Sequence, residues 1–397
     1  MEQYVATKEK YKDCILFYRL GDFYEMFFDD AILASKELEI TLTGKDCGME
    51  ERAPMCGVPF HAVEGYLTRL VQKGYKVAIA EQMEDPKLAK GLVKREVIRV
   101  VTPGTIMSSQ ALDETKNNYL MAVVYTGNNY GIATVDITTG DFFVTEVTSE
   151  RALLDEINKF TPSELVCNEA LFMSGLDMDE LKERYHFAVT ALENRFFSDD
   201  DCRKILKEHF HVMSLEGLGL GDYENGMIAS GAVLQYLYET QKNDLSHLTK
   251  ITPYTTGQFM MIDTSTRRNL ELVETLREKQ KRGSLLWVLD KTKTAMGART
   301  LRKYVEQPLI DKKSIVKRLD AVAELKDNAI CREEIREYLN PVYDLERLVG
   351  KITYQSANPR DLIAFQRSLS SLPSVKCILK DTESDLLKEI YEELDPL

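Results

Sequence analysis

The stretch GDFYEMFFDD, residues 21–30, decides how the N-terminal part of this chain folds. It follows the apolar run CILFYRL, residues 14–20, which is typical of a β-strand that ends at a glycine turn. Side chains two residues apart in an extended segment lie on the same face. Phe23 and Glu25 are therefore expected to project together from an exposed face, and Tyr24 to point the other way.

These two side chains allow two interpretations. An exposed phenyl ring beside a hydrogen-bonding carboxylate could probe a base step from the DNA minor groove, where proteins insert apolar side chains between bases. The alternative is that Phe23 belongs to the core, as aromatic residues commonly do, and that Glu25 is merely solvated. The ten residues taken alone favour the alternative, so the rest of the chain has to decide.

Composition and charge narrow the class of protein. A length of 397 residues predicts two or three domains, and 44% hydrophobic with 29% charged residues is typical of a globular protein. The net charge of −13 excludes a general polyanion binder, so any nucleic-acid contact needs local basic patches.

Two basic patches are present, each of which could instead be a solvated surface. In residues 263–303, eleven Lys or Arg residues stand against five Asp or Glu residues, a balance of +6. In residues 87–99, five basic residues stand against Glu96 alone, a balance of +4. The five are Lys87, Lys90, Lys94, Arg95 and Arg99.

The seven cysteines are scattered and include no CxxC pair, and the five histidines form no ligand pattern with them. This predicts reduced thiols rather than a disulfide framework or a zinc site. The N-terminus has no apolar signal core, and no apolar run approaches membrane-spanning length. We therefore expect a cytoplasmic protein without membrane partners.

The pattern up to about residue 115 predicts an α/β domain with a mixed sheet. Cys56–Pro59 is interpreted as a tight loop, and residues 102–118 as a linker. Asp29 or Asp30 is expected to cap a helix that ends near Leu38. The other expected elements are strands over residues 40–42, 75–80 and 96–101 and a helix over residues 61–73.

Beyond residue 118, three consecutive strands, a helix and a further strand predict a second α/β domain that ends near Lys250. From Asp263 onward the pattern is helical. Thr264 or Ser265 is expected to cap a helix that carries Leu270, Val273 and Leu276. The expected strands are 119–125, 131–137, 142–147 and 164–167, and the expected helices are 150–159, 285–289, 297–305, 314–328 and 385–394.

Catalytic motifs are missing from the sequence. No GxxxxGK[ST], GxSxG, HExxH or GxGxxG pattern occurs. Asp136 and Asp141, in GIATVDITTGDFF, could be nuclease metal ligands, but two-metal chemistry needs several converging acidic groups. Without a third partner, structural or turn roles are favoured for both.

Several blocks of the chain together resemble the bacterial MutS family of DNA mismatch-recognition proteins. The N-terminal block is MEQYVATKEKYKDCILFYRLGDFYEMFFDDA, and APMCGVPFHAVEGYLTRLVQKGYKVAIAEQME and REVIRVVTPGT resemble the rest of the mismatch-binding domain. DTSTRRNLELVETL and LLWVLDKTKTAMGARTLRKYVEQPL resemble the core with its lever helices. The blocks run to about Pro308 in the family order, which makes the resemblance specific.

The resemblance implies a mixed-sheet α/β mismatch-binding domain at 1–115, an RNase H-like α/β connector at 116–250 and the first part of an all-α core at 251–397. Phe23 matches the wedge that stacks on a mispaired base, and Glu25 matches the glutamate that hydrogen-bonds it. Arg95 lies in a matched basic strand and is expected to contact a backbone phosphate. No catalytic, cofactor-binding or metal-binding residue is implied in this chain.

The resemblance also implies what lies outside this chain: the clamp, the second core segment and the C-terminal ATPase, which would bind ATP and Mg. The implied partners are mismatched double-stranded DNA and, for a complete protein, MutL and a second copy in a homodimer. Two alternatives remain open. One is an RNase H-like metal-dependent nuclease, and the other is a protein-interaction scaffold built on the connector.

Overall fold

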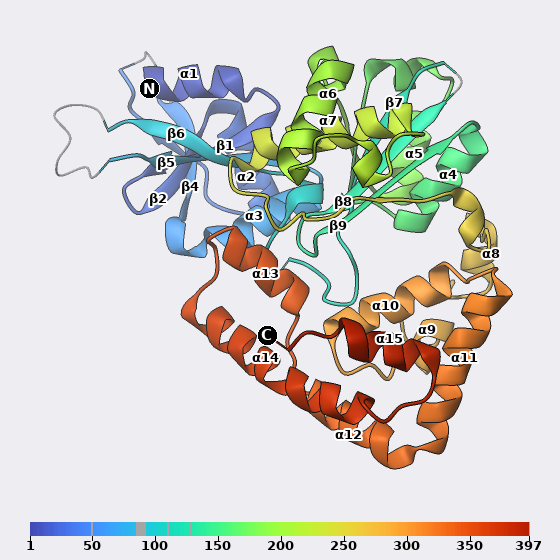
Figure 1. Ribbon diagram of the computed structural model, residues 1–397. Helices are drawn as coiled ribbons and strands as arrows, with labels where there is room; N and C mark the ends of the chain where they lie inside the picture. Colours follow the sequence, from blue (N-terminus) through green and yellow to red (C-terminus); the bar gives the residue numbers. More distant parts are fainter. Residues whose placement is uncertain (49–50, 85–92, 109–110, 128, 397) are drawn as a thin grey trace.

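The computed structural model describes residues 1–48, 51–84, 93–108, 111–127 and 129–396. Two six-stranded mixed sheets are followed along the chain by a helical region (Figure 1). The predicted order of two α/β parts and one all-α part is thus confirmed. Within the described ranges, no helix is both long and apolar enough to cross a membrane.

The first sheet has the strand order β3-β4-β2-β1-β5-β6. Only β1 and β5 pair in parallel, which makes the sheet mixed as predicted. Its strands are β1 (Cys14–Leu20), β2 (Phe23–Phe27), β3 (Thr43–Lys45), β4 (Ala53–Pro59), β5 (Lys76–Gln82) and β6 (Arg95–Val101).

Helices cover both faces of this sheet because its strands alternate two sets of apolar side chains. On one face, α2 (Phe28–Leu38) and α3 (Val63–Gln72) pack on a core that includes Phe17, Tyr24 and Met26. On the other face, Tyr4 of α1 (Glu2–Lys10) packs in a second cluster with Leu16, Tyr18 and Phe27.

The second sheet has the order β11-β10-β7-β8-β9-β12. An antiparallel meander, β7-β8-β9, is followed by β10 and β11, which run parallel to β7. This arrangement agrees with the expected RNase H-like fold. The strands are β7 (Leu120–Tyr125), β8 (Tyr130–Asp136), β9 (Asp141–Val147), β10 (Glu164–Cys167), β11 (Ala188–Ala191) and β12 (Thr252–Pro253).

The helices of this second part enclose its sheet. The largely buried α7 (Glu224–Gln241) and α6 (Asp199–Phe210) lie on one face, and α4 (Glu150–Phe160) and α5 (Met178–Tyr185) supply the core on the other. The end of α7 also touches the first sheet, because Gln241 donates a hydrogen bond to the Val100 carbonyl.

The helical region lies below both sheets in the view of Figure 1. A small core between α11, α14 and α15 contains Ala321, Val375, Leu379 and Leu387. The helices are α8 (Thr264–Asn269), α9 (Leu285–Leu289), α10 (Ala295–Glu306), α11 (Lys312–Asp327), α12 (Ala329–Leu339), α13 (Leu345–Thr353), α14 (Pro359–Leu379) and α15 (Asp385–Glu393).

Some expected elements of the first domain differ in the structure. Residues 40–42 are not a strand, and the strand begins at Thr43. Cys56–Pro59 is not a tight loop but part of β4, because β2 needs an antiparallel partner on its outer side. Asp30 does not cap α2; it is buried and accepts hydrogen bonds from the Leu16 backbone N and from Lys8 Nζ.

Thr102–Thr105, the start of the expected linker, is buried, and Thr102 and the Gly104 N both donate to the carboxylate of Glu164. One further expectation was wrong. Asp263, rather than Thr264 or Ser265, caps α8, which ends at Asn269 and does not reach residues 270–276. The segment between the expected strands 119–125 and 131–137, for which a turn at Asn128-Asn129 is predicted, includes Asn128, which lies outside the described residues.

Candidate nucleic-acid interface

A tight hairpin presents the N-terminal candidate residues. Leu20 of β1 pairs with Phe23 of β2, which leaves only Gly21 and Asp22 in the loop. Gly21 has a φ of +59°, a left-handed conformation that glycine adopts without steric cost and that two-residue hairpins require. The sequence therefore places Phe23 at the first position after the turn.

Phe23 is exposed, while its neighbours hold the strand in the core. Its exposed fraction is 46%, whereas Tyr24, Met26 and Phe27 are all 5% exposed or less. Tyr24 points to the opposite face, as predicted, and its hydroxyl donates to Glu81. Burial and the Glu81 carboxylate raise the pKa of Tyr24, so this hydroxyl remains a donor at neutral pH. Phe23 is thus an apolar side chain on a rigid strand.

Glu25 shares the face of Phe23 but is more enclosed than expected. Only 17% of its side chain is exposed, and Lys45 Nζ of β3 donates to Glu25 Oε2 over 2.6 Å. Gly57 lies beside Glu25 on β4, where an added Cβ would approach Glu25 Cγ to 3.5 Å and the Tyr24 carbonyl to 3.2 Å. Gly57 therefore allows β4 to pack closely against the backbone of β2 at Tyr24, while Glu25 would meet an added Cβ only at an ordinary contact distance.

A second exposed aromatic ring borders the hairpin and was not found from the sequence. Phe60 is 40% exposed, and its backbone N donates to the Asp22 carbonyl over 3.0 Å. The guanidinium of Arg19 lies 3.8 Å from the centre of the Phe60 ring. The signal in the sequence was the proline-aromatic step Pro59-Phe60, which was interpreted as the end of a loop.

Arg95 lies on the same sheet face as Phe23 and Glu25. Its guanidinium is 5.3 Å from the centre of the Tyr18 ring, and Tyr18 pairs with Glu25 across β1 and β2. Its Nε donates to the Arg19 carbonyl over 2.7 Å, so Arg95 also supports the strand that leads into the hairpin. No contact between Arg95 and the other two candidates is seen among the described residues.

The other described basic residues of the segment 87–99 form ion pairs with carboxylates of the same domain. Lys94 pairs with Glu96 over 2.6 Å, and Arg99 pairs with Glu64 over 3.4 Å. Lys87 and Lys90 lie outside the described residues. The described part of the patch therefore presents less free positive charge than its composition indicated.

Comparison with known families accounts for nearly the whole chain in three consecutive matches. MutS domain I matches residues 1–110, MutS domain II matches residues 118–249 and MutS domain III matches residues 265–396. The chain belongs to the MutS family. The hairpin with Phe23 and Glu25 lies in MutS domain I, strands β7 to β11 of the second sheet lie in the match to domain II, and α9 to α15 lie in the match to domain III.

Curated relatives support the same assignment. The chain is 68% identical over 397 residues to the DNA mismatch repair protein MutS of Lachnoclostridium phytofermentans, covering all of this chain and 43% of that protein. It is 55% identical over 400 residues to the protein of that name from Ruminiclostridium cellulolyticum and 54% identical to that from Acetivibrio thermocellus, covering 46% of each. The chain thus spans less than half the length of these relatives.

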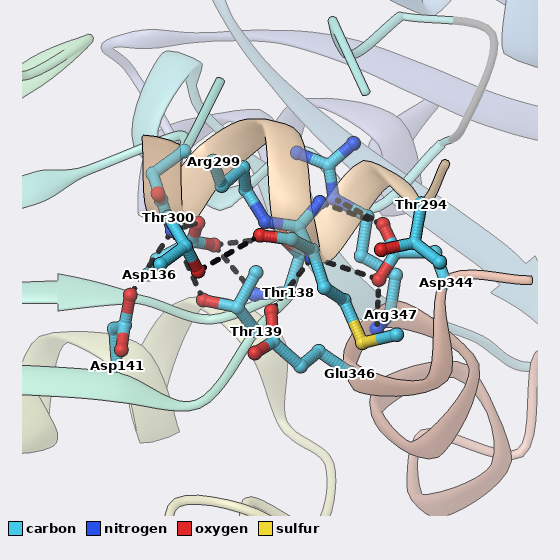
Figure 2. A network of polar contacts seen from close by, with 12 residues as sticks. Asp136, Thr138, Thr139, Asp141, Thr294, Arg299, Thr300, Asp344, Glu346 and Arg347 are labelled. Carbon is cyan, nitrogen blue, oxygen red and sulfur yellow. Dashed lines mark hydrogen bonds and ion pairs between the residues drawn. The ribbon is translucent and has the colours of Figure 1, made fainter. Parts of the chain in front are cut away.

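In MutS domain II, the two aspartates considered as nuclease ligands serve as hydrogen-bond acceptors (Figure 2). Asp136 is fully buried and accepts from Asn117, the Asn118 N, and both the N and the hydroxyl of Thr138. Asp141 accepts from Lys303 Nζ over 2.7 Å. These contacts tie the strand ends to the preceding segment and to α10, which is a structural role.

Proposed function

We propose that the first domain of this MutS-family chain recognises mispaired or unpaired bases in duplex DNA by inserting Phe23 into the base stack and kinking the duplex. The observation that carries the proposal is the exposure of Phe23, at 46%, on a strand whose next residues are buried. A ring held in this way can enter a base step without disturbing the protein core.

In this mechanism, mispaired DNA is distinguished from paired DNA by how easily the base step can be deformed. A mispaired step costs less to unstack and kink than a paired one, so the same wedge binds it more tightly. Stacking of an aromatic ring on a base contributes about 1–3 kcal/mol. Glu25 supplies one hydrogen bond to the displaced base, and Arg95, on the same face, contacts a backbone phosphate.

We further propose domain bounds of 1–115, 116–250 and 251–397, and no catalysis by these domains themselves. In a complete protein, mismatch recognition would initiate DNA mismatch repair. ATP and Mg would bind in a separate C-terminal ATPase domain, a second copy would complete a homodimer, and MutL would be the protein partner. The proposed location is the cytoplasm. These statements rest on the family relationship.

The test compares a G·T mismatch with the matched homoduplex by fluorescence anisotropy. Phe23→Ala is expected to remove most of the preference for the mismatch and to leave weak non-specific binding, because phosphate contacts carry no information about the lesion. Phe172→Ala is the matched control: Phe172 is 44% exposed, but it lies in the second domain. If Phe23→Ala still prefers the mismatch over the homoduplex as strongly as the unaltered chain, Phe23 is not the inserted residue and the proposal is wrong.

A further inference from the structure

A cavity of about 620 Å³ lies where the second domain meets the helical region. Its walls come from the ends of α4 and α5, from α8 and α10, and from the segment before β7. Nine basic side chains line it, although the chain as a whole carries a net charge of −13. They are Lys116, Lys159, Arg184, Arg267, Arg268, Lys279, Arg299, Arg302 and Lys303.

Only two carboxylates, Glu274 and Glu306, line the same cavity. Glu306 is shared between two guanidinium groups, at 3.8 Å from Arg267 and 3.4 Å from Arg302. Both arginine side chains are largely buried, at 10% and 12% exposed, and the Nε atom of each is buried without a hydrogen-bond partner. Because each Nε atom is shielded from solvent, these two arginines can meet a ligand in the cavity only through their terminal nitrogens.

Four of the nine cations form no ion pair within the described ranges. They are Lys116, Arg184, Arg268 and Lys279. Cations gathered in a concave site repel one another and raise the local concentration of anions. The cavity therefore has an excess of positive charge that an anion would neutralise.

This site also explains the basic patch of residues 263–303 that the sequence shows. Six of the eleven basic residues in the segment 263–303 line the cavity. They reach it from α8, from α10 and from the irregular segment between α8 and α9. The wedge hairpin of the first domain uses none of them, so their convergence needs a separate reason.

We propose that this cavity binds a small anion that carries several phosphate groups, such as an inorganic polyphosphate chain or the triphosphate of a free nucleotide. Ligand sites commonly enclose roughly 300–1,000 Å³, and this volume falls in that range. Arginine forks bind phosphate oxygens with two parallel hydrogen bonds, and lysines add point charges. Bound there, the anion joins the second domain to the helical region.

Isothermal titration calorimetry of the full 397-residue chain with sodium tripolyphosphate tests the proposal. One saturable site is expected, with an affinity that falls as salt is added. The double variant Arg268→Gln/Lys279→Gln is expected to weaken binding by roughly tenfold or more, since it removes two charged donors. Both side chains are exposed and unpaired among the described residues, so the fold is retained, as thermal melting by circular dichroism will verify.

The matched control removes two positive charges elsewhere. Lys36→Gln/Lys380→Gln replaces two exposed lysines of α2 and the end of α14, and it is expected to bind tripolyphosphate as the unaltered chain does. Equal weakening by both double variants would show that overall charge alone attracts the anion. That result, or the absence of saturable binding, overturns the proposal.

Competition identifies the source of the phosphates. ATP without Mg²⁺ and a short oligothymidylate are each titrated against bound tripolyphosphate. Displacement by ATP but not by the oligonucleotide supports a site for small polyphosphates. Binding of the oligonucleotide alone would make the cavity part of a nucleic-acid path and would reject the small ligand. Phe23→Ala leaves all these results unchanged, so this test is independent of the proposed mismatch recognition.

Discussion

At the scale of single residues, the ion pair between Glu25 and Lys45 sets the charge beside the exposed ring of Phe23. Lys45 is 41% exposed, whereas only 17% of the Glu25 side chain is exposed. The ammonium group therefore lies at the surface and balances the charge of a mostly enclosed carboxylate. In the proposed recognition of DNA, this pairing reduces the repulsion between Glu25 and the phosphates.

Lys45→Met is expected to weaken binding to mismatched and matched DNA by a similar factor, because the carboxylate of Glu25 then repels the backbone. Glu25→Gln should retain or strengthen binding, and adding it to Lys45→Met should restore much of the affinity for the homoduplex. Lys73→Met breaks the comparable pair with Glu37, where Lys73 is 47% exposed, and should change neither affinity. Anisotropy titrations of the four variants measure these affinities. If the effects of Lys45→Met and Glu25→Gln on the free energy of DNA binding simply add, the two residues do not act together and this expectation is wrong.

Buried thiols are expected to lower the stability of the fold at alkaline pH. Burial raises the pKa of Cys56 to about 11 and the pKa values of Cys14, Cys167 and Cys202 to about 12. A folded-state pKa above that of the unfolded chain stabilises the fold below the unfolded pKa, and this contribution is lost as pH rises through the folded value. The free energy of unfolding should therefore fall between pH 9 and pH 11.

Urea unfolding at pH 7.5, 9 and 10 measures this effect. Cys56→Ala should flatten the alkaline decline, because it removes one buried titrating group. Cys377→Ala should leave the decline unchanged, since Cys377 is exposed. An identical pH profile for both variants would mean that the thiols do not determine the alkaline limit.

At the scale of elements, the close approach of α7 to the second sheet depends on glycines on both sides, Gly131 in β8 and Gly226 in α7. A Cβ added to Gly131 of β8 would lie 2.1 Å from the carbonyl carbon of Asn225 in α7. The obstacle is backbone, which cannot move aside as a flexible side chain can. A side chain at Gly131 would therefore push the helix away from the sheet.

Gly131→Ala is expected to destabilise the chain by about 1–3 kcal/mol or more, the usual cost of overpacking a core. Gly65→Ala is the matched control: it lies inside α3, has no atom within 4 Å of an added Cβ, and should gain about 0.5–1 kcal/mol. Urea midpoints of both variants measure the difference. A neutral Gly131→Ala would show that α7 can shift away from the sheet.

At the scale of the whole molecule, two arginines fasten the helical region to the segment that precedes the second sheet. Arg299 is 3% exposed, binds Asp344 through two nitrogens at 2.6 and 2.8 Å, and donates to the Glu114 carbonyl over 3.0 Å (Figure 2). Arg347 donates to the Asp113 and Lys116 carbonyls. The junction is therefore held by hydrogen bonds and ion pairs, which require a specific geometry of the two parts.

Arg299→Met is expected to cost about 3–5 kcal/mol, because it removes the two-nitrogen pair with Asp344 and leaves that carboxylate only the longer 3.8 Å pair with Arg347. Arg195→Met removes a similar two-nitrogen pair, with Glu239, from a site where the arginine is 55% exposed. That change should cost less than about 1 kcal/mol. Unfolding of the two variants by urea compares them directly, and equal costs would contradict the structural role of the junction.

Local patterns in the sequence predicted much of the fold and part of the candidate site. The run of residues 14–20, the turn at Gly21 and the alternation after it predicted β1, the hairpin, and the common face of Phe23 and Glu25. Strand alternation and glycine turns depend on residues that are neighbours in the sequence. They can therefore be predicted without knowing which strands pair with one another. The same holds for the order of α/β and helical parts, which follows from hydrophobic periodicity.

Only the tertiary structure decided which distant groups meet. Lys45 reaches Glu25 across twenty residues through β3 and β4, and Cys56–Pro59 became a strand because β2 lay beside it. The cavity gathers cations from residues 116 to 303, whose spacing carries no periodic signal. Long-range pairing follows from sheet register and helix packing, which local propensity does not specify. The sequence by itself therefore determined the exposed position of Phe23 beside Glu25, and the fold determined the pairing of Glu25 with Lys45 and the basic cavity.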